Sequence, residues 1–343
     1  MTDSTHRFEI RAALPADRDE LLTLAGHLNT VNLPADAQAI TAILEKSEQS
    51  FTGSLPRERR AQVFILRDRE TGRAIGSSTL VAQLGRPDAP YIYFEVSTEE
   101  KYSRDQNLHF EHYVLRLGFS YAGPTELAGL VVDPEYRNSP GRLGLAISYV
   151  RFLFVAANRS DFQDELLAEL LPPLEPDGTS HLWNSLGRRF TGMTYRHADR
   201  LSHENKDFIR DLFPSGPVYA SLLSEPAQAV IGKVGHQTRG VEKMLRRVGF
   251  RYAERVDPFD GGPHFTAAVD EVTVIQRYRQ MTLVHEEGGD KPMLVARLTS
   301  EAPFAVAVPT RVWDRGTVIG VPREAAEILG ASPGDLVHAV PLP

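Results

Sequence analysis

Residues 126–157 restrict the possible fold more than any other part of this sequence. Residues 126–132, ELAGLVV, form a nearly continuous apolar run, which Asp133 and Pro134 end. A short apolar run closed by a turn signal is typical of a buried strand. A loop with two glycines follows, and residues 145–157 are apolar enough for a buried helix. The stretch therefore predicts a strand, a glycine-containing loop and a helix in direct succession.

This succession has a specific chemical use. The first backbone N–H groups of a helix have no partner inside the helix, and the helix dipole favours negative charge beside them. Glycine lets the loop backbone approach an anion closely. The segment is therefore a candidate phosphate-binding site. The alternative, that Gly141 and Gly144 only form a surface turn, stays open.

Hydrophobic patterns predict further elements on both sides of this stretch. Residues 7–13 alternate as a short strand, and residues 35–49 repeat apolar side chains at helical spacing. Residues 63–82 are typical of two strands joined by a polar turn. After a polar linker at residues 284–292, the last 51 residues alternate apolar runs with Gly and Pro turns, which predicts a small β-rich domain.

One short pattern occurs twice in the chain. It predicts, in both places, a helix that ends at a glycine and passes into a strand, which favours two similar α/β halves. Chance similarity stays open as the alternative. The matching positions are Leu182, Leu186, Gly187 and Phe190 in the first copy and Met244, Val248, Gly249 and Tyr252 in the second.

Composition excludes several classes of function. Lys and Arg number 38 against 45 Asp and Glu, so the net charge is −7, and without a basic stripe we expect no nucleic-acid binding. The chain has no cysteine, which excludes disulfides and a thiol nucleophile. The histidines show no metal-binding pairing, so we expect no metal. The polar N-terminus and the lack of a long apolar run favour a cytoplasmic protein without membrane contact.

Several phrases of the sequence resemble the arginine N-succinyltransferase family. ELAGLVVDPEYR, SYVRFLFVAANR, LWNSLGRRFTGM, FIRDLFP and GFRYAERVDPFDGGP keep the order and approximate spacing of that family over roughly residues 8–280. The resemblance implies an α+β, GNAT-like acyltransferase fold, with succinyl-CoA or acetyl-CoA as acyl donor and an amino-acid amine as acceptor. We accordingly expect an N-terminal half at 1–160 with the acyl-CoA loop, a second half at 161–283 that completes the site, and the β-rich domain at 293–343.

The resemblance also implies where the acyl donor lies. In this fold the pantetheine lies beside the central strand, and the pyrophosphate lies on the following loop and helix start. A backbone N–H of the strand, here that of Leu130, usually contacts the developing oxyanion. The implied donor-binding residues are Leu130, Val131, Val132, Arg137, Gly141, Arg142, Gly144, Leu145 and Ala146.

Amide formation from a thioester requires a neutral amine, a stabilised oxyanion and a proton for the leaving sulfur. The family has a histidine proton donor in a VHPxT motif, whereas this chain reads VGHQT. Gly235 therefore occupies the histidine position, and His236 follows one place later. His236 is the candidate proton donor, with an exposed loop histidine as the alternative. Glu126 is a candidate general base, with a structural hydrogen-bond acceptor as the alternative.

Other positions differ from the family near the expected acceptor. The phrase PYIYFEVSTEEKYS carries Glu95 where the family has an arginine, and Leu171 replaces another arginine. Because arginine is suited to carboxylates, these losses indicate an altered substrate. Tyr93 and Glu95 are candidate acceptor contacts, and Glu95 suits a cationic acceptor. An exposed glutamate at the end of a strand is the alternative.

The sequence thus predicts an acyl-CoA-dependent N-acyltransferase that transfers a small acyl group directly to the amine of arginine or a related amino-acid metabolite. Direct transfer is expected because no cysteine can carry the acyl group. The alternative is a catalytically silent homologue that binds CoA or an amino acid and acts as a partner or regulatory subunit. A homo-oligomer, or pairing with a homologous subunit, is also expected.

Overall fold

Two sets of chain segments each pack around a core of their own in the computed structural model, which describes residues 6–28, 33–137, 139, 141–204 and 207–343. Unit 1 comprises Met1–Gln83, Thr125–Asp164 and Ala268–Pro343, and unit 2 comprises Leu84–Pro124 and Glu165–Ala267. Both units are built from segments that are not consecutive in the sequence. Their bounds differ from those of the three consecutive domains expected above, and that division stays a prediction.

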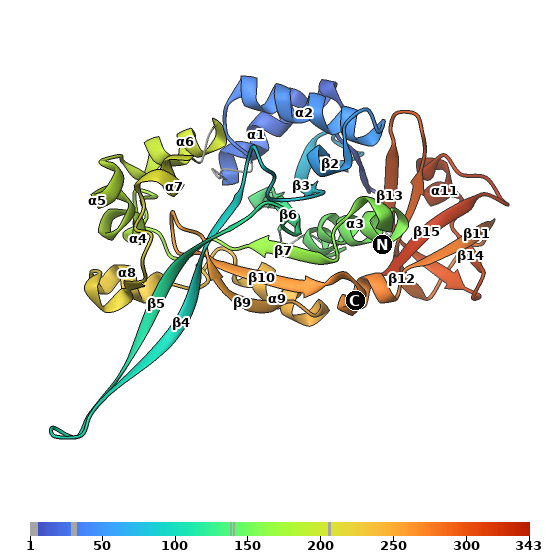
Figure 1. Cartoon of the computed structure of the whole chain (residues 1–343). Helices are drawn as coiled ribbons and strands as arrows, with labels where there is room; N and C mark the ends of the chain where they lie inside the picture. The colour runs from blue at the N-terminus through green and yellow to red at the C-terminus, as the bar shows by residue number, and fades with distance from the viewer. Residues whose placement is uncertain (1–5, 29–32, 138, 140, 205–206) are drawn as a thin grey trace. The chain divides into compact units, whose positions relative to one another are not determined.

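The first part of unit 1 is an antiparallel sheet in the order β1, β2, β3, β6, of which Figure 1 labels β2, β3 and β6. Leu21 and Leu24 of α1 and Ile40 of α2 bury their side chains against Val63 and Ile65 of β2. Asp36 caps α2 by accepting a hydrogen bond from the Ala39 N–H at 2.8 Å. The strands are β1 (Phe8–Ala12), β2 (Ala61–Asp68), β3 (Ala74–Val81) and β6 (Thr125–Val132), and the helices are α1 (Arg18–Leu28), α2 (Ala37–Phe51) and α3 (Leu143–Ala157).

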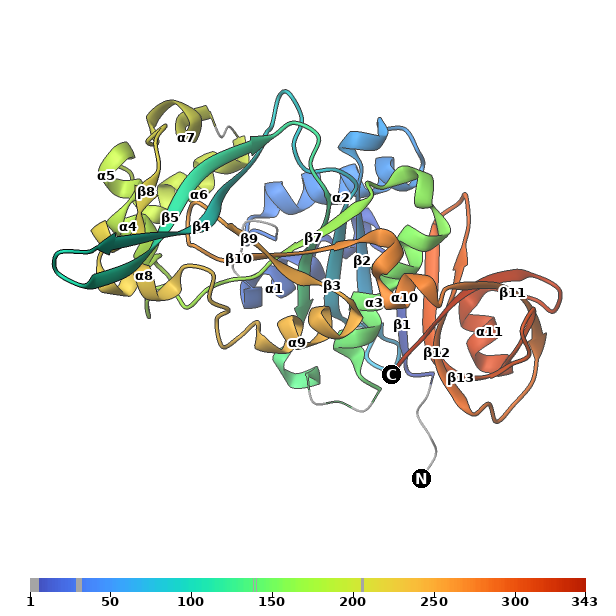
Figure 2. The ribbon, with the colours of Figure 1, turned by 60° about the horizontal axis from the view of Figure 1, so that its bottom comes forward.

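These elements form where the sequence predicts them. Figure 2 shows α3 lying against β3, which it contacts along with β6. Eleven of the fifteen residues of α3 are buried, so its apolar composition reflects a helix enclosed on several sides rather than an amphipathic surface helix. The predicted succession of strand, loop and helix is confirmed, and the helix begins at Leu143, two residues earlier than expected.

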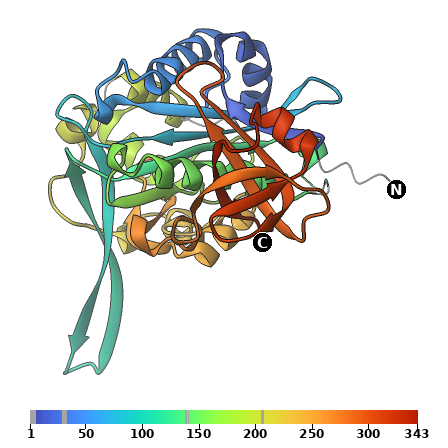
Figure 3. The ribbon, with the colours of Figure 1, turned by 90° about the vertical axis from the view of Figure 1, so that its right-hand side faces the viewer.

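The C-terminal segment, coloured orange to red in Figure 3, adds five strands and two short helices to unit 1. Strand β13 pairs with β12 on one side and with β1 on the other, so the β-rich tail continues the sheet that begins at the N-terminus. Its core includes Leu283, Val295, Val308 and Val337. The elements are α10 (Thr273–Gln276), β11 (Arg279–His285), β12 (Lys291–Leu298), β13 (Ala305–Asp314), β14 (Val318–Val321), α11 (Arg323–Leu329) and β15 (Leu336–Pro341).

Unit 2 holds a sheet in the order β7, β10, β9, β4, β5, β8, together with six helices among its described residues. Trp183 is fully buried at the centre of its apolar core. The strands are β4 (Tyr91–Ser103), β5 (Leu108–Ser120), β7 (Glu165–Glu169), β8 (Val218–Tyr219), β9 (Arg251–Val256) and β10 (Pro263–Ala268). The helices are α4 (His181–Ser185), α5 (Gly187–Thr191), α6 (Tyr195–Glu204), α7 (Asp207–Leu212), α8 (Glu225–Val230) and α9 (Arg239–Val248).

The repeated helix–glycine–strand pattern is present only in its second copy. Helix α9 ends at Gly249, which has a φ of 115°, and β9 follows as predicted. Gly187 instead begins α5, and α6 is the next element. A Cβ on Gly187 would lie 2.4 Å from the Trp183 ring, so this glycine permits close packing rather than ending a helix. The prediction for the first copy is therefore wrong.

Within the described ranges, no helix is long and apolar enough to cross a membrane.

Candidate functional site

Strand β6 contains a β-bulge at the position expected to contact the acyl group. Ser77 pairs with Val131 and Thr79 with Ala128, so two residues, Gly129 and Leu130, lie opposite Ser78 alone. Gly129 has a φ of 55°, and a Cβ there would lie 2.8 Å from Thr79 Oγ1. Glycine in the left-handed region is typical of one class of bulge. The bulge removes Leu130 from the regular pairing with β3 and leaves it partly exposed.

The turn after β6 is fixed by short-range hydrogen bonds. Asp133 accepts a hydrogen bond from the Glu135 N–H at 2.9 Å and caps a 3₁₀ turn, Pro134–Tyr136. Arg137 Nε donates to the Val132 carbonyl oxygen at 3.1 Å. The guanidinium of Arg137 is thereby held against the end of the strand. Val131 itself is buried in the core, whereas Val132 is partly exposed.

The first backbone N–H groups of α3 have no partner inside the helix. Gly141 and Arg142 have φ values of 98° and 52°, and Arg142 offers no side-chain cap to the helix. Leu145 and Ala146 donate their N–H groups to the Arg142 carbonyl oxygen at 2.8 and 3.1 Å. The amides of the two preceding residues therefore lie ahead of the first helical hydrogen bonds. A Cβ on Gly144 would meet no atom within 4 Å, which leaves room for a ligand beside these amides.

Glu126 and Arg151 place two charged groups in the interior of unit 1. Glu126 is 4% exposed, and Arg151 of α3 is 2% exposed. Arg151 donates to the Ala128 carbonyl oxygen at 3.2 Å and to Ser148 Oγ at 2.8 Å. Burial lowers the pKa of Arg151 to about 9, and the charge of Glu126 acts in the opposite direction. A buried arginine requires such a counter-charge, which favours the structural role for Glu126.

Packing leaves no room for a side chain at Gly235, where the resemblance implies the family's histidine. The Gly235 N–H donates to the Leu171 carbonyl oxygen at 2.8 Å, and a Cβ on Gly235 would lie 2.9 Å from that oxygen and 2.7 Å from the Pro172 carbonyl oxygen. His236 lies next to it in an exposed turn before α9. The placement of His236 matches the alternative of an exposed loop histidine.

The two candidate acceptor contacts, Tyr93 and Glu95, lie two residues apart on β4. The Tyr93 side chain is buried, and the Arg255 guanidinium lies 4.6 Å from its ring centroid. Glu95 is exposed and is paired by register with Arg116 of β5 and Arg255 of β9. Opposite charges in neighbouring strands stabilise a sheet, which favours the structural alternative for Glu95.

The structure brings together a polar cluster that the sequence did not reveal. Glu169 at the end of β7, Asp257 directly after β9 and His264 on β10 place their ligand atoms within 4.8 Å of one another. Tyr91 Oη lies 2.6 Å from His264 Nδ1, and Glu169 Oε1 lies 3.6 Å from His264 Nε2. His264 is fully buried, whereas Glu169 and Asp257 are partly exposed. We call Glu169, Asp257, His264 and Tyr91 the acidic cluster.

Negative charge is in excess around the acidic cluster. Asp260 is buried beside it and accepts a hydrogen bond from the Gly262 N–H at 2.7 Å. Burial, followed by the charge of Asp257, raises the pKa of Asp260 well above its usual range. Burial and the charge of Glu169 also raise the pKa of Tyr91. Such an environment stabilises a bound cation.

Only a weak sequence signal pointed to the acidic cluster. Its members come from four strands or strand ends, spread over more than 170 residues of sequence. The family-like phrase that ends at residue 263 contains Asp257 and Asp260, and His264 follows it directly. Side chains that come together through strand order cannot be identified from sequence spacing alone.

Comparisons with known proteins agree on one family. The family model described as "Arginine N-succinyltransferase beta subunit" matches residues 8–274. The arginine N-succinyltransferases of Salmonella arizonae and Salmonella newport are each 35% identical over 288 residues, covering 82% of this chain and 83% of each relative.

A solved structure supports the same assignment over nearly the whole chain. Arginine/ornithine succinyltransferase subunit AI from Pseudomonas aeruginosa matches with a TM-score of 0.84 and 28% identity, covering 98% of this chain and 99% of that one. The predicted α+β, GNAT-like fold is confirmed. This chain therefore belongs to the arginine N-succinyltransferase family and is an acyl-CoA-dependent N-acyltransferase.

Proposed function

We propose that this enzyme transfers a succinyl group from succinyl-CoA directly to the amine of arginine or a closely related cationic amino acid. The acidic cluster of unit 2 is the main support for a cationic acceptor. Two partly exposed carboxylates, Glu169 and Asp257, lie within 4.8 Å of each other and beside His264. A guanidinium group is planar and offers several N–H donors, so it suits a pair of carboxylates held at this spacing.

The start of α3 supports the choice of a CoA thioester as the acyl donor. The N–H groups of Leu143 and Gly144, with the dipole of a fifteen-residue helix, suit a coenzyme's pyrophosphate. The Leu130 N–H, at the bulge of β6, suits the thioester carbonyl oxygen as its negative charge develops. The names of the relatives, which include arginine and ornithine succinyltransferases, support succinyl as the acyl group, against the altered substrate that the two lost arginines led us to expect.

The transfer forms one bond and breaks another. The lone pair of the neutral amine attacks the thioester carbonyl carbon, and the new C–N bond gives a tetrahedral oxyanion. The oxyanion collapses with cleavage of the C–S bond, the amine nitrogen loses a proton, and the sulfur gains one. The products are an amide and free CoA. His236 remains our candidate for the proton donor. Direct transfer is favoured because the sequence has no cysteine and no serine-elbow motif to carry the acyl group.

Free thiol release tests this proposal directly, because a chain without cysteine contributes no background thiol. Purified protein is incubated with succinyl-CoA or acetyl-CoA and with arginine, ornithine or citrulline. We expect arginine to exceed citrulline at least tenfold in kcat/KM, because citrulline has the same shape without the positive charge. Thiol release at the background rate with every amine, despite measurable CoA binding, would contradict the proposal and indicate the catalytically silent homologue.

Carboxylate variants test the acceptor site. Glu169→Gln and Asp257→Asn should each lower kcat/KM for arginine about tenfold or more, since about 1.4 kcal/mol of lost binding corresponds to a factor of ten. The dissociation constant of CoA should change less than twofold. Glu225→Gln, at an exposed position on α8, is the matched control. A divalent cation at the same cluster would instead make turnover sensitive to EDTA.

Assembly and location remain predictions. The matching family model is that of a beta subunit, and the Pseudomonas aeruginosa structure is that of subunit AI, which supports the expectation of a homo-oligomer or of pairing with a homologous subunit. The cytoplasmic location expected from the sequence also stays a prediction.

A further inference from the structure

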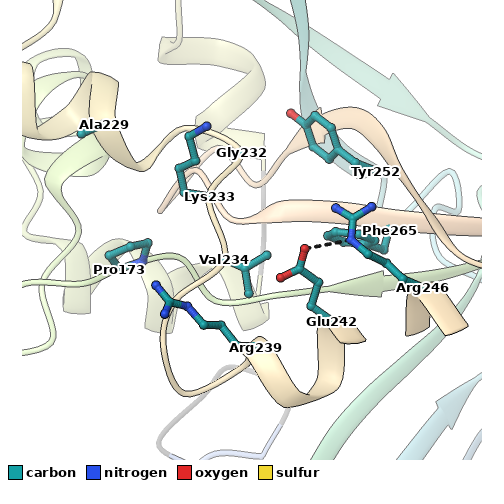
Figure 4. Close-up of a pocket in the computed structure, with 10 residues that line it drawn as sticks. All are labelled: Pro173, Ala229, Gly232, Lys233, Val234, Arg239, Glu242, Arg246, Tyr252 and Phe265. Carbon is teal, nitrogen blue, oxygen red and sulfur yellow. Dashed lines mark hydrogen bonds and ion pairs between the residues drawn. The ribbon is translucent and has the colours of Figure 1, made fainter. Parts of the chain in front are cut away.

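Unit 2 contains an open cavity of about 450 Å³ beside the first two turns of α9 (Figure 4). Its walls combine apolar side chains with three cations and one carboxylate. The lining residues are Pro173, Ala229, Gly232, Lys233, Val234, Arg239, Glu242, Arg246, Tyr252 and Phe265. We call this space the α9 cavity.

The α9 cavity is separate from the acidic cluster. Phe265, which lines the cavity, directly follows His264 on β10. Neighbouring side chains of a strand point to opposite faces of the sheet. Tyr252, which pairs with Phe265 across β9 and β10, lines the cavity as well. None of the four residues of the acidic cluster lines the cavity, so the two are distinct sites.

The charge of the α9 cavity suits an anion. Glu242 Oε1 is 2.9 Å from Arg246 Nε, so the only carboxylate of the lining is engaged by one of its three cations. The Arg246 guanidinium also lies 4.7 Å from the Phe265 ring centroid, which fixes its orientation. Among the residues that the structure describes, Lys233 and Arg239 form no ion pair. These two side chains leave the lining with an excess of positive charge.

Neutral hydrogen-bond donors reinforce this preference. Burial raises the pKa of the Tyr252 hydroxyl to about 12, so at neutral pH it remains a hydrogen-bond donor. Thr238 precedes α9 but donates its hydroxyl to the Leu171 carbonyl oxygen at 3.1 Å, and it gives the helix no side-chain cap. The first amides of the ten-residue helix therefore add partial positive charge beside Arg239.

We propose that the α9 cavity is an anion-binding site for a phosphate or carboxylate group on a small organic body. Lys233 and Arg239 bind the anionic group, and the Arg246–Phe265 pair with Tyr252 contacts the body. Both cations suit either anion, and the apolar walls favour an organic ligand over an inorganic ion. The ligand comes from one of two sources, either a phosphate of the coenzyme or a free carboxylate metabolite.

Calorimetry on the full chain tests the site with two probes, adenosine 3′,5′-bisphosphate for the phosphate and succinate for the carboxylate. The double variant Lys233→Gln/Arg239→Gln should weaken binding of at least one probe tenfold or more. Arg247→Gln is the matched control, because Arg247 is an exposed cation of the same helix that does not line the cavity. It should change either affinity less than twofold.

Two further ligands identify the source. If the double variant weakens binding of CoA but not of dephospho-CoA, the anion is the coenzyme's 3′-phosphate. If it weakens succinate binding and leaves CoA binding unchanged, the anion is a free carboxylate. The site is wrong if the wild-type protein binds neither probe, or if the double variant and Arg247→Gln change the affinities by the same factor. None of these readouts requires turnover, so failure here is distinct from failure of the proposed reaction.

Discussion

At the scale of single residues, the packing around Gly235 has a testable effect on stability. The resemblance implies a histidine at Gly235, and the carbonyl oxygens of Leu171 and Pro172 lie close to where a Cβ on this residue would be. Restoring the histidine requires this backbone to move. The loss of the aligned histidine is therefore coupled to local packing.

Gly235→His should accordingly destabilise the protein. A Cβ at 2.7 Å from a carbonyl oxygen is a steric clash, and we expect a loss of about 1–3 kcal/mol in the free energy of unfolding. Urea unfolding followed by circular dichroism measures this loss. Gly240→Ala, where a Cβ would meet nothing within 4 Å, is the control and should be neutral or slightly stabilising. A Gly235→His protein as stable as the wild type would contradict the packing argument.

Asp260 gives a second prediction at this scale, concerning pH. Its pKa is raised in the folded state, so the folded protein keeps a proton that the unfolded chain loses above about pH 3.9. The unfolded state then binds fewer protons, and this group makes stability fall as pH rises from there toward the folded pKa. Asp260→Asn keeps the acceptor for the Gly262 N–H and removes this dependence.

We therefore expect Asp260→Asn to stabilise the protein more at pH 8 than at pH 5, by up to about 1.4 kcal/mol for each unit by which the pKa is raised. Urea titrations at the two pH values measure the difference. Asp105→Asn, at an exposed position between β4 and β5, should show no such dependence. Equal stabilisation at both pH values would rule out a titrating Asp260.

At the scale of elements, a substitution at the start of α3 should weaken coenzyme binding without changing the stability of the protein. A Cβ on Gly144 would meet no protein atom within 4 Å, yet it would occupy the space beside the leading amides of the helix. Gly144→Ala should leave the free energy of unfolding unchanged within about 0.5 kcal/mol, the usual range for surface substitutions. It should weaken CoA binding about tenfold, as measured by calorimetry. Wild-type affinity in this variant would place the coenzyme elsewhere.

Local patterns of sequence predicted the elements well and the site only partly. The apolar run before Asp133 and the glycine loop predicted β6 and α3 because a strand and a helix depend mainly on nearby residues. The bulge at Gly129 depends on the register with Ser78, about 50 residues earlier, and no local pattern indicates it. The acidic cluster depends on strand order in unit 2, so Glu169 and His264 could not be paired in advance.

At the scale of the whole molecule, β13 connects the end of the chain to its beginning. Ile10 of β1 pairs with Ala307 of β13, although about 300 residues separate them. Pairing over such a distance must overcome a large loss of chain entropy, which slows folding. The sheet of unit 1 is therefore complete only when β13, from the β-rich tail, has paired with β1.

This pairing has a consequence for biosynthesis. At ~5–20 residues per second, a ribosome needs roughly 15–60 s to progress from the first strand to the one that covers it. Throughout that interval the nascent chain carries one bare edge at Phe8–Ala12, a surface open to incorrect strand addition. Late synthesis of β13 therefore makes incorrect pairing at β1 the main hazard that this topology carries during translation.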